Sequence, residues 1–265
     1  MIGVFDSGSG GLTVLQAVRE VLPTADVVYF GDIKNAPYGE KSRQELSGLT
    51  VQALKLLQER GATSIISACN SVSASLAVSL FDIFSLAPAQ LIEMVGPTVA
   101  QLRGSAARIL LCATPATISS DIYQQAFQMV GKQITTVDIP ELAGAIEFDD
   151  PSDVGESEKI EAMLTKSFAG VDLKSFDVLV LGCTHYPLVS PIFEKVLASL
   201  ESNHTLQLFD PAHAVAARAR QLFWPREVGD GKTTFLISKD STPFRQRVAQ
   251  LFPPTKYTCT IEVLK

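Results

Sequence analysis

Two cysteines, Cys69 and Cys183, are the residues best suited to chemistry, because each follows an apolar run rich in β-forming residues (residues 64–68 and 178–181). Such runs are typical of buried strands. In an open α/β sheet, ligands and catalytic groups lie beyond the carboxyl ends of the strands. Two thiols placed in this way predict chemistry with two matched acid/base groups. The alternative is two buried structural cysteines, since a free cysteine often packs as a small hydrophobic residue.

The polar neighbours of the two thiols favour catalysis. Asn70 and Ser71 follow the first thiol, and Thr184 and His185 follow the second. A thiol, with an ordinary pKa of about 8.5, is a competent base when its neighbours bring that pKa close to the working pH. His185 stands two positions after Cys183 and can do this for that thiol.

Residues 5–13 place several glycines between a predicted strand and a predicted helix. Backbone N–H groups at a helix N-terminus form an anion site. The segment lacks the Gly-Lys-Ser/Thr of a P-loop, and Thr13 stands where a dinucleotide motif needs its third glycine. We therefore expect the bound anion to be a carboxylate. A helix cap with a tight turn would explain the glycines but not Asp6, which can accept a proton from, or orient, Cys69.

Strand-like runs alternate with helical patterns along the chain, which predicts parallel βαβ units with right-handed crossovers. Several of the strand-like runs end in side chains that can transfer protons or form hydrogen bonds. In a parallel sheet these side chains would lie along one edge. The predicted strands cover residues 2–5, 27–30, 64–68, 109–113, 134–137, 178–181, 206–209 and 233–237. The predicted helices cover residues 12–22, 46–59, 154–168, 193–200 and 214–223.

The segments around the two thiols resemble each other, as a weak internal duplication would. We therefore expect two α/β halves that face one another across a cleft, with crossings near residues 85–96 and 201–207. This gives a discontinuous first domain, residues 1–95 plus 207–265, and a second domain, residues 96–206.

Composition narrows the class of protein. The chain has 265 residues, of which 46% are hydrophobic and 19% charged, as in a globular rather than a disordered protein. The net charge of −6 argues against a general nucleic-acid binder, which normally carries a basic field. The four cysteines form no disulfide framework and no zinc-ligand spacing, so we expect no metal.

Neither a membrane span nor a leader is expected. Residues 61–81 carry no charge, but they are rich in serine and make a poor bilayer segment; a buried strand followed by a buried helix fits them better. The chain enters a strand at once, over residues 2–5, without a signal-peptide pattern. Free thiols that matter also fit a reducing compartment, so we expect a cytoplasmic protein.

Four motifs in order resemble those of the glutamate racemases, which belong to the cofactor-independent aspartate/glutamate racemase superfamily. They are Asp-Ser-Gly with Gly-Gly at 6–11, Gly-Asp with Pro-Tyr-Gly at 31–39, Ala-Cys-Asn-Ser at 68–71, and Gly-Cys-Thr-His-Tyr-Pro-Leu at 182–188. Four motifs in register are far more specific than any one of them. The resemblance covers nearly the whole chain, and Thr114, Thr117 and Glu147 look like further family positions.

The resemblance implies two similar parallel-sheet α/β domains with the active site in the cleft between them. One cysteine would remove the α-proton and the other would reprotonate the opposite face, with no cofactor. Cys69, assisted by Asp6, would act on D-glutamate, and Cys183, assisted by His185, on L-glutamate. The implied catalytic set also includes Asp32 and Glu147. The implied substrate-binding residues are Ser7, Pro37, Tyr38, Gly39, Asn70, Ser71, Thr114, Thr117 and Thr184.

The resemblance also implies that D-glutamate serves peptidoglycan synthesis in a bacterium and that the enzyme is a homodimer. Two departures stand out. Residues 33–35 read Ile-Lys-Asn where the family usually has Thr-Ala-Arg, and Ser71 replaces a threonine but keeps the hydroxyl.

Physical chemistry supports the two-thiol interpretation independently. The α-proton of an amino acid is very weakly acidic, so an enzyme without an electron-sink cofactor needs preorganised hydrogen bonds and tuned bases. No lysine follows a strand in a pocket-like context, so a pyridoxal phosphate Schiff base is not indicated.

Two alternatives stay open. The first is an aspartate or broad-specificity amino-acid racemase; aspartate racemases usually carry glutamate where His185 stands, which favours glutamate as substrate. The second is a non-catalytic amino-acid-binding protein, against which the presence of both cysteines and both helper residues argues.

Overall fold

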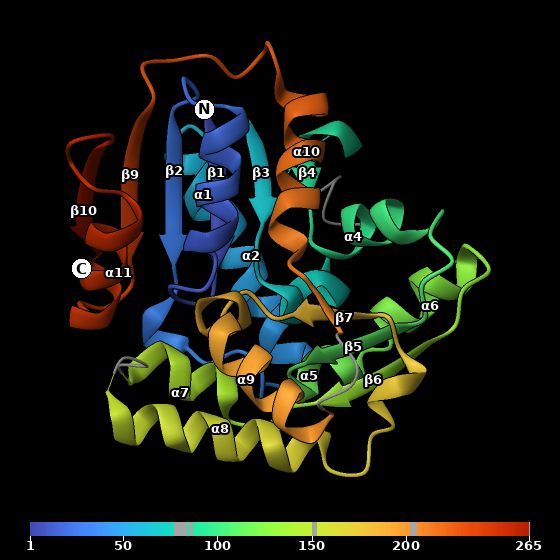
Figure 1. The fold of residues 1–265 in the computed structure, drawn as a ribbon. Coiled ribbons are helices and arrows are strands. Elements are labelled where there is room, and N and C mark those ends of the chain that lie inside the picture. The colour runs from blue at the N-terminus through green and yellow to red at the C-terminus, as the bar shows by residue number, and fades with distance from the viewer. Residues whose placement is uncertain (77–83, 85–86, 150–152, 202–205, 265) are drawn as a thin grey trace.

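The computed structural model describes residues 1–76, 84, 87–149, 153–201 and 206–264, and it has two parallel sheets with helices around them (Figure 1). The larger sheet has the strand order β10-β9-β2-β1-β3-β4, and the smaller one β6-β5-β7-β8. All the described strand pairs are parallel. The predicted fold class, α/β with two parallel sheets, is confirmed.

The elements alternate along the chain, as the βαβ pattern predicts. The larger sheet contains β1 (Ile2–Asp6), β2 (Val27–Gly31), β3 (Ser64–Ser67), β4 (Leu91–Ile92), β9 (Lys232–Ile237) and β10 (Thr258–Val263). The smaller sheet contains β5 (Ile109–Ala113), β6 (Ile134–Asp138), β7 (Val178–Gly182) and β8 (Gln207–Phe209). The helices are α1 (Leu12–Val21), α2 (Arg43–Glu59), α4 (Val95–Leu102), α5 (Pro115–Ser119), α6 (Ile122–Met129), α7 (Leu142–Phe148), α8 (Val154–Phe168), α9 (Ser190–Leu200), α10 (Pro211–Phe223) and α11 (Thr242–Leu251).

The strand register brings the carboxyl ends of neighbouring strands level. Asp6 of β1 lies opposite Gly31 of β2, and Ala113 of β5 lies opposite Gly182 of β7. The residues that follow these strands therefore gather at one edge of each sheet. Strands β2 and β3 of the larger sheet point toward the smaller sheet (Figure 1).

Helices cover both faces of each sheet. On the larger sheet, α1, α10 and α11 pack against one face, where Phe235 and Phe244 lie in the core, and α2 packs against the other through Leu54 and Leu57. On the smaller sheet, α7, α8 and α9 cover one face and α4 and α6 the other. A strand covered on both faces is apolar throughout, which explains the continuous hydrophobic runs in the sequence.

Every predicted strand is present, with boundaries that differ by at most one residue. Two strands were missed. β4 is only two residues long, and β10 is an edge strand whose exposed and half-buried residues, among them Thr258 and Glu262, include no long apolar run.

The predicted helices are also present, but three begin earlier than predicted, and α4, α5, α6, α7 and α11 were not predicted. α2 begins at Arg43 because Ser42 and Glu45 form a capping box, a polar signal that hydrophobic periodicity overlooks. A buried helix was predicted after β3; the structure has a short 3₁₀ helix, η2 (Asn70–Ser75), and residues 77–81 lie outside the described residues.

The domain division stays a prediction, with one adjustment. β8 pairs with β7, so residues 207–209 belong to the smaller sheet rather than to the first domain. Ala212 and Val215 of α10 then pack in the core of the larger sheet. We therefore place the second boundary after Phe209; residues 85–86 and 202–205 of the predicted crossings are outside the described part of the chain.

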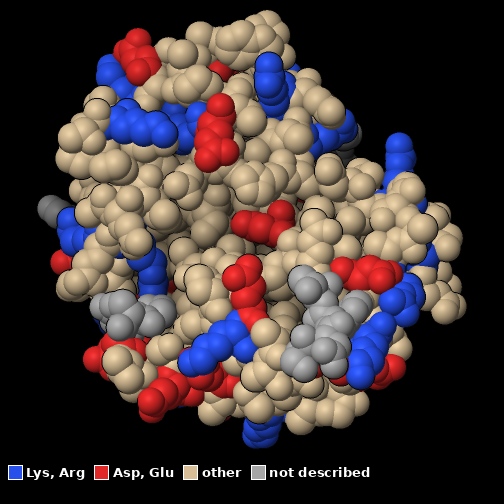
Figure 2. Space-filling view, in the orientation of Figure 1, with Lys and Arg blue, Asp and Glu red and all other residues tan. Residues whose placement is uncertain are grey.

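The surface carries charges of both signs. On the face in Figure 2, lysines and arginines lie scattered among aspartates and glutamates rather than in one basic field. Within the described ranges, no helix combines the length and the apolar character needed to cross a membrane.

Candidate active site

The two thiols lie at one small cavity where the strand ends of the two sheets meet. Its volume is about 10 Å³, room for one water molecule at most. The cavity is therefore too small for an amino acid as it stands and must widen to admit one. All of its lining residues except Ala143 were predicted as site residues. They are Ser7, Pro37, Tyr38, Gly39, Cys69, Asn70, Ser71, Thr114, Ala143, Cys183, Thr184 and His185.

Cys69 is held as a thiol. It follows β3 and is buried, and its Sγ donates to the Ser7 hydroxyl at 3.8 Å. Burial raises the pKa of Cys69 to about 12, and the charges of Asp6 and Cys183 act in the same direction. At neutral pH this sulfur carries its proton and can give it to a ligand.

Cys183 lies beside a polarised imidazole. Its Sγ is 3.7 Å from His185 Nδ1, and His185 Nε2 is 2.7 Å from Glu147 Oε2. Burial alone would lower the pKa of His185, but its hydrogen bonds to Cys183 and Glu147 raise it to about 10. The ring is therefore an imidazolium at neutral pH, and its Nδ1–H faces the sulfur.

Glu147 supports this imidazolium from behind. Although burial acts to raise the pKa of Glu147, hydrogen bonds from His185 and Ser9 lower it below the ordinary value. Ser9 donates to Oε2 through both its hydroxyl (2.6 Å) and its backbone N–H (2.9 Å). Glu147 is thus an ionised carboxylate one step behind the cavity, which it does not line.

Asp6 is at the end of β1, as predicted, but its hydrogen bonds go to residues other than Cys69. Oδ1 accepts the Gly8 N–H at 2.9 Å, and Oδ2 accepts the Thr184 hydroxyl at 3.1 Å. Asp6 acts on Cys69 through its charge, which contributes to the raised pKa of that thiol.

Asp32 holds Tyr38 in place rather than lining the cavity. Its Oδ2 accepts the Tyr38 hydroxyl at 2.7 Å, and Asn35 Nδ2 donates to both carboxyl oxygens at 2.9 and 3.1 Å. Burial and the charge of Asp32 raise the pKa of Tyr38, so its hydroxyl remains a donor. Asn35, one of the three residues that depart from the usual family pattern, belongs to this arrangement.

Three predicted binding residues form a hydroxyl cluster that joins the two halves. Ser71 Oγ lies 3.0 Å from Thr114 Oγ1, which lies 3.1 Å from Thr117 Oγ1. Nearby, Asn70 Oδ1 accepts the Tyr123 hydroxyl at 2.6 Å. Asn70 Nδ2 is buried without a partner in the described part of the chain, so it is available to a ligand.

The glycine-rich loop was predicted to bind the carboxylate of a ligand, but two of its N–H donors bind carboxylates of the protein itself. Gly8 donates to Asp6 and Ser9 to Glu147. The glycines allow this close packing. A Cβ on Gly8 would lie 2.6 Å from the Glu147 carboxyl carbon, and one on Gly10 would lie 2.7 Å from His185 Nδ1.

Three functional neighbours were not identified from the sequence: Ser9, Tyr123 and Arg247. Arg247 Nη1 donates to Ser9 Oγ at 2.6 Å and to the Glu147 carbonyl at 3.0 Å. The signal for this residue was present, because positions 244, 247 and 248 share one helix face. An arginine on an apolar face indicates a partnered cation.

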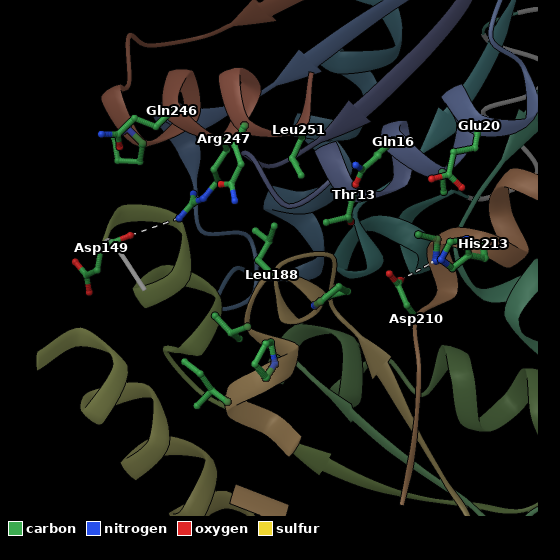
Figure 3. A pocket seen from close by; sticks show the side chains of 18 of the residues that line it. Thr13, Gln16, Glu20, Asp149, Leu188, Asp210, His213, Gln246, Arg247 and Leu251 are labelled. Atoms are coloured by element: carbon green, nitrogen blue, oxygen red, sulfur yellow. Dashed lines mark hydrogen bonds between the residues drawn. The ribbon is translucent and has the colours of Figure 1, made fainter. Parts of the chain in front are cut away.

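A second, larger cavity of about 850 Å³ lies next to the site (Figure 3). Thr13, Leu188 and Arg247 are among its lining residues, and neither thiol reaches it. Among the described residues, no group of three or more histidine, cysteine, aspartate or glutamate side chains is arranged to hold a metal ion.

Two α/β halves that bring a protonated thiol and a thiol beside an imidazolium to one closed cavity have the layout of an enzyme that moves protons. Comparison with known proteins agrees. Residues 11–219 match the family model described as Asp/Glu/Hydantoin racemase. The chain belongs to this racemase family, and the predicted enzyme class, an amino-acid racemase and hence an isomerase, is confirmed.

Individual relatives support the resemblance to glutamate racemases. The glutamate racemase of Thermoanaerobacter pseudethanolicus is 32% identical over 249 residues, covering 92% of this chain and 89% of that protein. That of Lactobacillus helveticus is 35% identical over 219 residues, covering 81% of this chain and 77% of that protein. The structure of glutamate racemase from Francisella tularensis in complex with D-glutamate has a TM-score of 0.82 at 26% identity, covering 100% of this chain and 97% of that one.

Proposed function

We propose that this protein is a glutamate racemase that interconverts L- and D-glutamate by proton transfer between Cys69 and Cys183. The observation that carries the proposal is the placement of both thiols at one cavity, each with a different acid/base environment. The relatives named glutamate racemase, at 32% and 35% identity over most of the chain, support the choice of substrate.

In the proposed reaction, Cys183 removes the α-proton of L-glutamate and Cys69 delivers a proton to the opposite face. The Cα–H bond breaks as an S–H bond forms on Cys183, and the S–H bond of Cys69 breaks as the new Cα–H bond forms. The reverse sequence converts D-glutamate. The raised pKa of Cys69 supports its role as the proton donor toward L-glutamate.

The remaining polar groups would stabilise the developing carbanion and hold the substrate. The Asn70 amide and the hydroxyls of Ser7, Thr184 and the Ser71–Thr114–Thr117 cluster offer donors to the two carboxylates. Preorganised donors of this kind lower the barrier to forming a carbanion without an electron-sink cofactor. Tyr38, whose hydroxyl is held by Asp32, would form part of the wall of the small cavity.

We assign Asp6 as the helper of Cys69 and His185 as the helper of Cys183, with Glu147 fixing His185. We expect no cofactor, no metal and no nucleic-acid partner. The D-glutamate product would serve peptidoglycan synthesis in the cytoplasm of a bacterium, and the enzyme would act as a homodimer.

Purified protein incubated with L-glutamate and no added cofactor tests the proposal. We expect the optical rotation to decay to zero and D-glutamate to accumulate. Binding without turnover would instead favour the amino-acid-binding protein. A higher kcat/KM for L-aspartate than for L-glutamate would favour an aspartate or broad-specificity racemase, and would direct attention to residues 33–35.

A further inference from the structure

Arg247 is a buried arginine next to the candidate site but outside its small cavity. It lies on α11 beside Phe244 and Val248, and only 9% of its surface is exposed. Its guanidinium reaches α7, where it donates to the Glu147 carbonyl at 3.0 Å. It also donates to the Asp149 carbonyl at 3.4 Å (Figure 3). These carbonyls lie at the C-terminal end of α7, where a cation is favoured.

The same guanidinium fixes the direction of a chain of hydrogen bonds. Arg247 donates to Ser9 Oγ at 2.6 Å, and a guanidinium has no acceptor. The Ser9 hydroxyl must therefore accept from Arg247 and give its single proton to Glu147 Oε2, also at 2.6 Å. An ionised Glu147 accepts only, so His185 Nε2, 2.7 Å away, must be the donor to that oxygen.

This chain determines what His185 presents to the thiol. With the Nε2 proton committed to Glu147, Nδ1 is the ring atom that exchanges a proton with Cys183 Sγ. Arg247 also lies 3.7 Å from Glu147 Oε2, so its charge helps keep that carboxylate ionised.

We propose that Arg247 is a positioning residue for proton transfer at Cys183, acting through Ser9 and Glu147 on His185; this inference rests on the proposed function. Without Arg247, the Ser9 hydroxyl is free to turn away and Glu147 loses a neighbouring cation. His185 then loses its fixed orientation. Because Arg247 does not line the small cavity, the loss falls on kcat rather than on KM.

The competing explanation is that Arg247 merely ties α11 to α7. A double-mutant cycle separates the two, with kcat for L-glutamate measured in the wild type, Arg247→Met, Ser9→Ala and the double variant. We expect Arg247→Met to lower kcat about tenfold, the size expected for a lost hydrogen bond to a charged group. In the Ser9→Ala background, Arg247→Met should lower kcat about threefold or less, because the hydrogen bonds through the Ser9 hydroxyl are already absent.

Two further variants complete the design. Arg247→Lys should have a kcat between those of Arg247→Met and the wild type. An ammonium can still donate to Ser9, but it cannot donate in several directions at once as the planar guanidinium does. Arg245→Met is the matched control, because Arg245 is on the same helix, is paired with Asp240 and is exposed. It should leave kcat within about twofold. Multiplicative effects of Arg247→Met and Ser9→Ala, or an Arg247→Met enzyme with unchanged kcat, would overturn the proposal.

A readout that does not require turnover keeps this inference distinct from the proposed function. The His185 Nε2 proton should be observable by ¹⁵N-histidine NMR as a slowly exchanging signal, assigned by its loss in His185→Asn. We expect Arg247→Met to speed its exchange with water about tenfold, and Arg245→Met to leave it unchanged. Unaltered exchange in Arg247→Met would refute the positioning role, even if the wild type racemises nothing.

Discussion

The two thiols of the site differ in what surrounds them, although the segments that carry them resemble each other. Cys69 donates to the Ser7 hydroxyl and feels the negative charge of Asp6, which helps to raise its pKa. Cys183 faces the Nδ1 of an imidazolium backed by Glu147. In the proposed reaction, a symmetric interconversion would thus be served by asymmetric groups. The raised pKa of Cys69 keeps the proton on this thiol, so we expect the enzyme to be poised for L-glutamate.

The largest expected effect comes from removing either thiol. Cys69→Ser and Cys183→Ser should each lower kcat/KM by about a thousandfold or more in both directions. A hydroxyl is a far weaker acid than a thiol, so it donates a proton less readily, and its basic alkoxide form is not populated at neutral pH. Polarimetry with each enantiomer measures this. Cys112→Ser and Cys259→Ser are the controls and should retain activity, since neither thiol lines the cavity. Near-wild-type activity in either site variant would remove the two-thiol mechanism.

Substitutions of Asp6 and of His185 should affect the two directions of racemisation unequally. His185→Asn should lower kcat about a hundredfold from L-glutamate and less from D-glutamate, and Asp6→Asn should do the reverse. The equilibrium constant of one ties the two kcat/KM values together, so the difference must be sought in kcat, in KM or in solvent isotope effects. Equal losses of kcat in both directions for both variants would contradict the assignment of one helper to each thiol.

The sequence was sufficient to predict the half-sites but not the contacts that join them. Each strand end carries its own polar residues, and parallel register places them at one edge, so Asp6, Cys69 and Cys183 could be placed from local pattern alone. The hydrogen bonds from Ser9 to Glu147 and from Arg247 to Ser9 span more than a hundred residues of chain. No periodicity encodes such a pairing.

Polar helix caps and edge strands explain further differences between the predicted and the observed elements. The first turn of α2 is polar, so a reading based on apolar spacing begins it three residues late. β10 owes its place to pairing with β9 rather than to its own composition. The glycine loop was expected to bind the carboxylate of a ligand, and only the fold reveals that its Ser9 N–H donates to the protein's own Glu147.

The order in which Cys69 and Cys183 react with iodoacetamide tests, without substrate, whether the two thiols differ in protonation. The thiolate is the reactive form, and a thiol with a pKa of about 12 is almost wholly protonated at pH 8. In a Cys259→Ser background, Cys183 should therefore be alkylated at least about tenfold faster than Cys69, followed by peptide mass spectrometry. The rate at Cys69 should rise with pH toward about 12, since a raised pKa delays formation of the thiolate. Faster alkylation of Cys69 than of Cys183 at pH 8 would contradict the proposal that Cys69 is protonated in the resting enzyme.

The smallest expected effect comes from the glycine loop, which touches the two sides unequally. A Cβ on Gly10 would lie 2.6 Å from Thr184 Oγ1 and 2.7 Å from His185 Nδ1, so Gly10→Ala must displace groups of the Cys183 side. We expect kcat from L-glutamate to fall about tenfold, and kcat from D-glutamate to fall less, because the three atoms nearest to this Cβ belong to Thr184 and His185.

Gly48→Ala is the matched control for this substitution. Gly48 lies within α2, and a Cβ there meets nothing within 4 Å. It should leave both kcat values unchanged and raise the free energy of unfolding by about 0.5–1 kcal/mol, since alanine is the better helix former. Should Gly10→Ala instead lower both kcat values equally while the fold is retained, the loop would serve both thiols alike, and the asymmetry would have to reside in His185 and Asp6 alone.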